Sequence, residues 1–205
     1  MSVRAPWIEP VTLAGRHVRL EPADDRHLAD LVEAGSDPVV WAHLPWPQPR
    51  DEAAMRSLLE AERRVALPFA QVEVASGRAV GITTYRDVDE RNRTLEVGGT
   101  WLGRPWWRSA INTEAKLLFL GHAFDVLGAN RVAIKTDIRN ERSQAAIARL
   151  GAVREGVLRR QMIRPDGSLR DTVLFSVIAE EWPAVREHLR ARLTAHAVTS
   201  ETSRR

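Results

Sequence analysis

The sequence contains no cysteine among its 205 residues. Disulfide bonds, thiolate metal ligands and a cysteine nucleophile are therefore excluded, and we expect a protein of the reducing cytoplasm. No apolar run reaches the roughly 18 residues of a membrane span, and the first ten residues lack the apolar segment of a secretory signal. The six histidines show no metal-ligand spacing, so we also expect no metal site.

Lysine is almost absent, because only Lys116 and Lys135 occur among the 30 basic residues. The sequence pI of about 10.1 therefore reflects arginine content, while the formal net charge is only +3. Acidic and basic residues alternate without a run of five like charges, which disfavours the alternative of a nucleic-acid-binding protein. The glycine-rich loops typical of dinucleotide and P-loop sites are absent too.

Short strands and amphipathic helices fill most of the chain. Strands are predicted over 17–22, 69–75, 79–87, 94–102, 130–137, 153–163 and 170–178, and helices over 24–34, 51–66, 110–127, 141–150 and 180–193. Short connections between strands, including the Asp-Gly pair at 166–167, predict antiparallel hairpins, with one βαβ-like unit in the middle of the chain. The sequence therefore predicts a single α+β domain over residues 12–195, with an N-terminal arm (1–11) and a flexible tail (196–205).

The segment TWLGRPWWRSAINTEAK (100–116) places a basic, aromatic corner where a strand becomes a helix. The first turn of a helix has unpaired backbone N–H groups, and together with the helix dipole they can bind a phosphate. Arg104 and Arg108 would add positive charge. The alternative is that Ser109 caps the helix while the two adjacent tryptophans pack in the core.

Four segments together resemble the GNAT superfamily of acyl-CoA-dependent N-acyltransferases, in particular the ribosomal-protein N-terminal acetyltransferases. They are RHVRLEP, LEVGGTWLGRPWW, NTEAKLLFLGHAFDVLGANRVAIKTDIRNERSQAAIARLGAVREG and DTVLFSVIAEEWP. The resemblance extends from about Arg16 to Leu193. It implies a GNAT-like mixed, mostly antiparallel sheet flanked by helices, with acetyl-CoA as cosubstrate and no metal. It also implies direct transfer of the acetyl group, in a ternary complex, to a primary amine of a protein N-terminus or small molecule, and it is compatible with a homodimer.

The resemblance implies that the corner binds the coenzyme A pyrophosphate through backbone amides. The family pattern Gln/Arg-x-x-Gly-x-Gly/Ala reads here from Pro105 to Ala110, with Arg108 in place of the first glycine. We expect the cradle to survive if Arg108 has a negative φ angle, because binding rests on backbone donors. The implied coenzyme contacts are Thr100, Trp101, Leu102, Trp107, Arg108, Ser109, Ala110, Ile111, Asn112, Asn140 and Ser143.

Amine acylation requires a neutral amine, stabilisation of the developing oxyanion, and a proton for the leaving thiolate. Glu96 is the candidate base, since burial on its strand would raise its pKa, although a salt-bridge role is the alternative. By resemblance Asn140 contacts the pantetheine arm and Ser143 takes the position of the proton donor, which is tyrosine in many relatives. From the residues alone, Asn140 is simply a favoured helix cap.

The proline-rich segment 36–50 contains Trp41, His43 and Trp46, which the resemblance places at the acceptor wall. Aromatic rings suit a cationic amine, but the tryptophans could equally fill a small core under the loop, and His43 is an alternative base. His122, Trp7 and Trp182 are predicted to be packing residues.

Two questions remain open from the sequence. The chain could bind acyl-CoA without catalysis, since Arg108 alters the cradle and the only tyrosine, Tyr85, lies far from the expected position. The identity of the amine acceptor is not predicted, because acceptor walls consist of variable loops.

Overall fold

The computed structural model describes residue 7 and residues 9–202 of the chain. Most of the predicted N-terminal arm lies outside these residues. The strands are β1 Leu13–Ala14, β2 Val18–Pro22, β3 Ala66–Glu73, β4 Ala79–Asp89, β5 Thr94–Leu102, β6 Arg131–Asp137, β7 Val153–Ile163 and β8 Leu169–Ile178. The α-helices are α1 Leu28–Ala34, α2 Glu52–Arg63, α3 Ala110–Gly121, α4 Glu141–Leu150 and α5 Trp182–Thr202.

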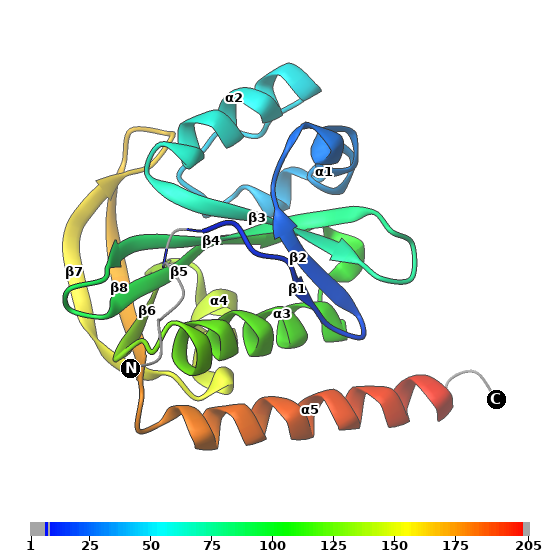
Figure 1. The fold of residues 1–205 in the computed structure, drawn as a ribbon. Coiled ribbons are helices and arrows are strands. Elements are labelled where there is room, and N and C mark those ends of the chain that lie inside the picture. The colour runs from blue at the N-terminus through cyan, green and yellow to red at the C-terminus, as the bar shows by residue number, and fades with distance from the viewer. Residues whose placement is uncertain (1–6, 8, 203–205) are drawn as a thin grey trace.

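One sheet runs through the molecule in the order β1-β2-β3-β4-β5-β6-β8-β7. Its neighbouring strands pair antiparallel except for β5 and β6, which are parallel and are joined through α3. Helices α1 and α2 cover one face, and α3, α4 and α5 lie on the other (Figure 1). The predicted α+β class, mostly antiparallel sheet and central βαβ unit are therefore confirmed.

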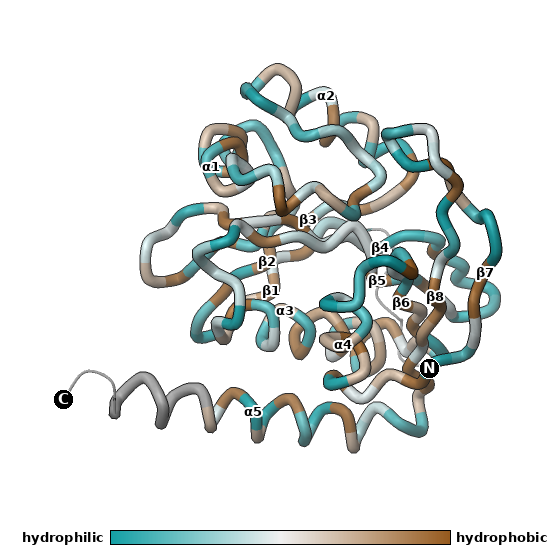
Figure 2. The backbone as a smooth tube through the Cα atoms, turned by 180° about the vertical axis from the view of Figure 1, so that it is seen from behind, coloured by the Kyte–Doolittle hydropathy of each residue, from teal (hydrophilic) through white to brown (hydrophobic). Residues whose placement is uncertain are grey.

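The sheet is buried on both faces, and each face has its own apolar core. Under α1 and α2, Trp41 packs on Trp101 with ring centroids 5.0 Å apart. Under α3 and α5, Phe69, Tyr85 and Phe119 form an aromatic cluster in which Tyr85 stacks on Phe119 at 4.0 Å. Apolar and polar stretches alternate along the surface helices (Figure 2), as expected when one side of a helix covers the sheet.

Helix α3 is attached to the start of the sheet by a buried carboxylate. Both carboxylate oxygens of Glu114 accept hydrogen bonds from backbone amides, namely those of Arg16 (2.9 Å), His17 (2.6 Å) and Val18 (2.9 Å). A Cβ on Gly15 would lie 2.5 Å from Glu114 Oε2, so the tight turn before β2 requires glycine. These bonds fix the position of α3 beneath the sheet.

Several elements differ from the sequence-based prediction, and among them α2 ends at Arg63 and β3 already begins at Ala66. The two-residue strand β1 was not predicted, because two residues show no alternation. The helix predicted over 110–127 is α-helical only to Gly121 and continues as a π-helical turn over His122–Val126 before Gly128, whose φ is 73°. Helix α5 continues to Thr202, well into the segment predicted to be a flexible tail.

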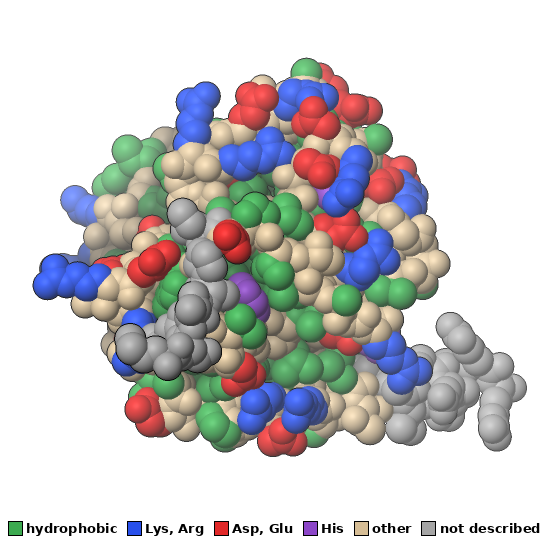
Figure 3. Space-filling model, in the orientation of Figure 1, with side chains coloured by type: hydrophobic (Ala, Val, Ile, Leu, Met, Phe, Trp, Pro, Cys, Tyr) green, Lys and Arg blue, Asp and Glu red, His purple; other side chains and the backbone are tan. Residues whose placement is uncertain are grey.

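The surface view agrees with a mixed charge distribution. On the face shown in Figure 3, arginine side chains are interspersed with acidic ones and form no continuous basic patch. Within the described part of the chain, no helix is both long and apolar enough to cross a membrane.

Candidate active site

Strands β5 and β6 separate after a short stretch of pairing. Three residue pairs form the ladder, Thr94 with Arg131, Leu95 with Val132 and Glu96 with Ala133. Both strands then continue without pairing to each other. The register of β5 against β4 also slips here, and Gly99 has a φ of 55°, which marks a bulge at the opening. The result is a cleft of about 1190 Å³.

The N-terminus of α3 borders this cleft. Ser109 Oγ accepts a hydrogen bond from the Ile111 amide at 3.3 Å, so the predicted cap is present. The backbone amides of Arg108, Ala110 and Asn112 have no hydrogen-bond partner among the described residues. Three free donors next to a helix dipole form a site for an anion.

The condition set for the cradle, a negative φ at Arg108, is not met, because its φ is 63°. This left-handed conformation is the one that glycine adopts most easily, and it costs a residue with a Cβ about 1–2 kcal/mol. The backbone thus follows the path expected for glycine although arginine occupies the position. The side chain of Arg108 is exposed and lines the cleft beside the free amides.

A cation–π pair forms part of the same wall. The guanidinium carbon of Arg142, in the first turn of α4, lies 3.5 Å from the ring centroid of Trp107. Trp107 Nε1 donates to the Leu102 carbonyl at 2.8 Å, which holds the ring at the end of β5. Arg142 was missed from the sequence, whereas the predicted cation Arg104 is paired with Asp37 at 3.0 Å.

Glu96 is the last residue of β5 that pairs with β6 and lies where these two strands separate. Its side chain lines the cleft, and the residue is only 7% exposed. Burial raises the pKa of its carboxyl group, and a salt bridge from Lys135 Nζ, 2.6 Å from Oε2, opposes that rise. Lys135 also binds Asp87 at 3.1 Å. Asp87 and Glu96 share this lysine, with Arg86 as a further nearby cation, and the two carboxyl groups form the acidic end of the cleft, where an ammonium group can bind.

Glycine at position 98 leaves room for this carboxylate in its observed position. A Cβ on Gly98 would lie 2.6 Å from Glu96 Oε1.

Asp87 and Lys135 were hard to identify as site residues from the sequence, because their contact depends on the pairing of β4, β5 and β6. Sequence reasoning missed both residues.

At the opposite wall, Asn140 caps α4. Its Oδ1 accepts from the Ser143 amide at 3.0 Å, which confirms the capping role. Its side-chain amide donors have no partner in the described structure, and both Asn140 and Ser143 line the cleft. Tyr85 does not line it, because its hydroxyl donates to the Phe119 carbonyl at 2.6 Å within the core.

The other predicted site residues divide between cleft and core. Among the predicted coenzyme contacts, Ala110 and Ile111 do not line the cleft, and Ile111 is buried on the core side of α3. Trp41 packs in the core, 6% exposed, with its Nε1 donating to the Gly35 carbonyl at 2.7 Å; it lies outside the main cleft but lines a smaller cavity beside it. His43 and Trp46 line the cleft, and burial is the main cause that lowers the pKa of His43.

Several of the predicted packing residues are confirmed as such. Trp7 and Trp182 are buried in the core, and His122 lies 3.3 Å from the Tyr85 hydroxyl, away from the cleft. No group of three or more potential metal-ligating side chains occurs in the region that the structure describes.

The comparison with known families agrees with this geometry. Residues 17–153 match the model of the acetyltransferase (GNAT) domain. The chain belongs to the GNAT acetyltransferase family. It is accordingly an acetyl-CoA-dependent acyltransferase.

Individual relatives extend the comparison. The chain is 27% identical, over 80% of its length and 90% of the relative, to the protein named "Putative ribosomal N-acetyltransferase YdaF" from Bacillus subtilis strain 168. A solved structure of a putative acetyltransferase from T. thermophilus is 43% identical with a TM-score of 0.84, covering 92% of this chain and all of that one. RimJ of Mycobacterium smegmatis, solved with CoA-disulfide, is 25% identical with a TM-score of 0.74, covering 89% of this chain and 95% of that one.

Proposed function

We propose that this protein transfers an acetyl group from acetyl-CoA to a primary amine directly, in a ternary complex. The observation that carries the proposal is the opening between β5 and β6. It brings the free amides at the start of α3 and the carboxylate of Glu96 to one continuous cleft. The cleft could thus hold the diphosphate of the coenzyme at one end and the reacting amine at the other, with the thioester between them.

The residues fit coenzyme A. The amides of Arg108, Ala110 and Asn112 would hold the pyrophosphate, with Arg142 as a nearby cation. The part of β5 from Thr100 to Leu102 faces the opening without a partner in β6, so its backbone can hydrogen-bond an extended pantetheine arm. The free side-chain donors of Asn140 are placed to contact the same arm.

In the proposed reaction, Glu96 accepts a proton from the acceptor ammonium, and Lys135 with Asp87 holds the carboxylate in place. The neutral nitrogen forms the new C–N bond to the acetyl carbon while the C–S bond breaks. Backbone N–H groups near the bulge at Gly99 are the candidate donors to the developing oxyanion. The nitrogen loses its second proton to water as the amide forms. The thiolate takes up one proton, with Ser143 as the proposed donor, directly or through water, and Ser143 regains its proton from water.

The acceptor is proposed to be either a protein N-terminus or a small amine. The name of the B. subtilis relative refers to ribosomal acetylation, which supports a protein acceptor. The cytoplasmic location and the homodimer stay predictions.

Glu96→Gln tests the base. We expect kcat to fall by roughly 10²–10⁴-fold while the affinity for acetyl-CoA stays unchanged, because the carboxylate lies at the acceptor end of the cleft. The matched control is Glu60→Gln, a change at an exposed position of α2 outside the cleft. Full activity of Glu96→Gln across pH 6–9 would contradict the assignment.

Thermal unfolding with acetyl-CoA distinguishes the enzyme from a non-catalytic binding module. A ligand at about 100 times its dissociation constant adds roughly 2.7 kcal/mol to the unfolding free energy. A saturable shift together with acetylation of an amine supports the enzyme. A shift without turnover on any amine would support the binding module, and no shift would mean that the cradle does not bind the coenzyme.

A further inference from the structure

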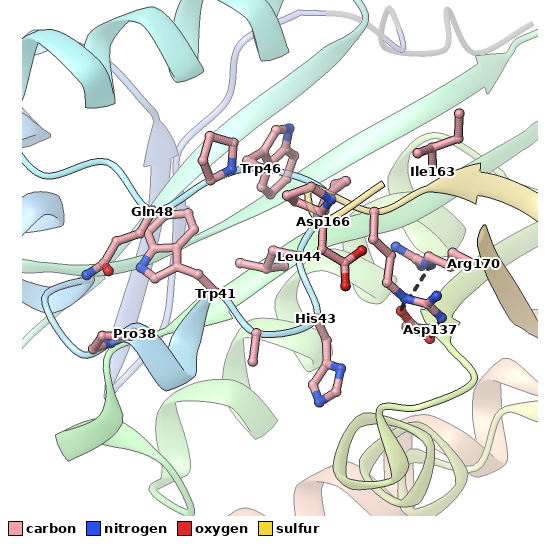
Figure 4. A pocket seen from close by; sticks show the side chains of 15 residues that line it. Pro38, Trp41, His43, Leu44, Trp46, Gln48, Asp137, Ile163, Asp166 and Arg170 are labelled. Atoms are coloured by element: carbon pink, nitrogen blue, oxygen red, sulfur yellow. Dashed lines mark hydrogen bonds and ion pairs between the residues drawn. The ribbon is translucent and has the colours of Figure 1, made fainter. Parts of the chain in front are cut away.

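A second, smaller cavity opens beside the acceptor end of the cleft. It lies between the proline-rich loop and the turn that joins β7 to β8 (Figure 4). Its volume is about 280 Å³. His43, Trp46, Asp137 and Arg170 line both this cavity and the main cleft. A molecule whose amine reaches Glu96 could therefore extend into the smaller cavity.

Arg170, on β8, is a buried cation without a hydrogen-bonded counterion. The residue is 8% exposed, and its Nε has no hydrogen-bond partner within the described residues. Its nearest carboxylate oxygen is Asp137 Oδ2, at 4.0 Å from Nε, which is beyond hydrogen-bonding distance. A buried guanidinium left in this way costs free energy unless an anion binds to it.

Asp137 does not satisfy Arg170 because other donors already occupy it. Arg164 Nε donates to Oδ2 at 2.6 Å and Arg164 Nη2 donates to Oδ1 at 2.8 Å, which makes a bidentate pair. The backbone amide of Arg139 adds a third bond to Oδ1 at 2.9 Å. One buried carboxylate therefore faces two guanidinium groups, and Arg170 retains its donors.

The other titratable groups of the cavity do not neutralise Arg170. Burial, with further contributions from Arg142, Arg164 and Arg170, lowers the pKa of His43 against the opposing effect of Asp137. Asp166 is exposed on the turn, where it accepts a hydrogen bond from the Ser168 amide at 2.9 Å. The imidazole of His43 is accordingly neutral near pH 7, and Arg170 supplies the unpaired charge.

We infer that the cavity at Arg170 binds a carboxylate of the amine acceptor, so that the preferred acceptor carries a carboxylate a few bonds from its reacting amine. The ammonium would enter at the acidic pair Asp87 and Glu96, while the carboxylate would pair with Arg170. Glu96 and Arg170 line the same cleft, so a single acceptor could contact both. This inference rests on the proposed function, because it assigns the substrate class of the same cleft.

Two sources of carboxylate are compared in the test. One pair of acceptors is a free amino acid and its amide, which differ in the α-carboxylate. The other is a short peptide with aspartate or asparagine at its second position, with a free N-terminus in both cases. Rates of acetylation and equilibrium binding in the presence of coenzyme A are measured for the wild type, for Arg170→Gln and for Arg159→Gln. Arg159 is an exposed residue of β7 that lines neither cavity, so its variant is the matched control.

We expect the wild type to prefer the acidic member of at least one pair by about 10-fold or more, since hydrogen bonds to a buried charge have that magnitude. The preference should fall to within about twofold in Arg170→Gln and persist in Arg159→Gln. The pair that shows the preference identifies the source of the carboxylate. Equal use of both members by the wild type, or a preference that survives in Arg170→Gln, would overturn the inference.

Failure of the proposed function is distinguishable from failure of this inference. If no amine is acetylated, the proposed function fails, while the binding measurements still report whether the acidic peptide or amino acid is preferred. If Arg170→Gln does not fold, Arg170→Lys retains the charge without the two-pronged geometry, and we expect an intermediate preference. If the wild type shows no preference for the acidic acceptor, that result alone refutes the inference.

Discussion

The buried lysine of α3 leads us to predict a steep pH dependence of the unfolding free energy. Lys116 is 8% exposed and has no carboxylate partner in the described structure. Its Nζ lies 2.8 Å from Thr100 Oγ1 and 3.5 Å from Thr83 Oγ1. Burial lowers its pKa from 10.5 to about 7. We predict that Lys116→Met removes a steep pH dependence of unfolding, because it removes the group that titrates.

The sign follows from proton binding in the two states. Between about pH 7 and pH 10.5 the native lysine is neutral while the unfolded lysine is protonated, so the unfolded state binds more protons and stability rises with pH. The slope is about 1.4 kcal/mol per pH unit in this window. From about pH 7.5 to about pH 9.5, the unfolding free energy of the wild type should increase by roughly 2–3 kcal/mol. In Lys116→Met it should stay nearly constant.

Few other groups interfere in this window. The pKa values of His43 and His122 are lowered, so both are neutral in native and unfolded chains above about pH 7.5. Burial raises the pKa of Tyr85 well above 10, and its opposite effect begins only near pH 10. The pKa of the only other lysine, Lys135, is raised, which moves its effect above the window. Lys116 therefore dominates the pH dependence of the unfolding free energy in this window.

Urea unfolding at five pH values is the assay, with fluorescence as the probe. The two threonines retain their mutual hydrogen bond of 2.8 Å in the variant, so the methionine leaves neither hydroxyl unpaired. Equal slopes in wild type and Lys116→Met would show that the lysine is not desolvated as described. A slope of opposite sign would refute the reasoning altogether.

Two further changes test the coenzyme site and the support of α3. Ala110→Pro removes one free amide at the first helical position, where proline is tolerated, and Ser109 already has the extended backbone that precedes proline. The affinity for acetyl-CoA, measured by titration calorimetry, should fall about 10-fold, while the melting temperature stays unchanged. Arg108→Gly, which keeps every backbone donor, should change that affinity less than about fivefold, and a larger loss would assign phosphate binding to the arginine side chain. Glu114→Gln should lower the unfolding free energy by about 1.5–3 kcal/mol, because the charged group that accepts hydrogen bonds from three backbone amides is lost. A decrease below about 0.5 kcal/mol in denaturant unfolding would contradict this.

Features that depend on neighbouring residues were predictable from the sequence. Asn140 and Ser109 cap their helices, and Gly151 ends α4 with a φ of 104°, because capping and turn preferences act within a few residues. The alternation of apolar residues placed most strands, and together with the hairpin turns it indicated a mostly antiparallel sheet. Glu96 could be selected for the same reason, as a carboxylate within a buried strand.

The chemistry of the site was decided by tertiary structure. The opening between β5 and β6, the salt bridge of Lys135 with Glu96 and the occupied carboxylate of Asp137 all join residues far apart in the chain. The left-handed conformation of Arg108 was not predictable from local sequence, since the loop path is imposed by the strand and helix on either side. Sequence determined which side chains carry charge and where helices begin and end. Only the fold decided which charges lose their water and which find partners, because desolvation and pairing depend on distances that local sequence does not specify.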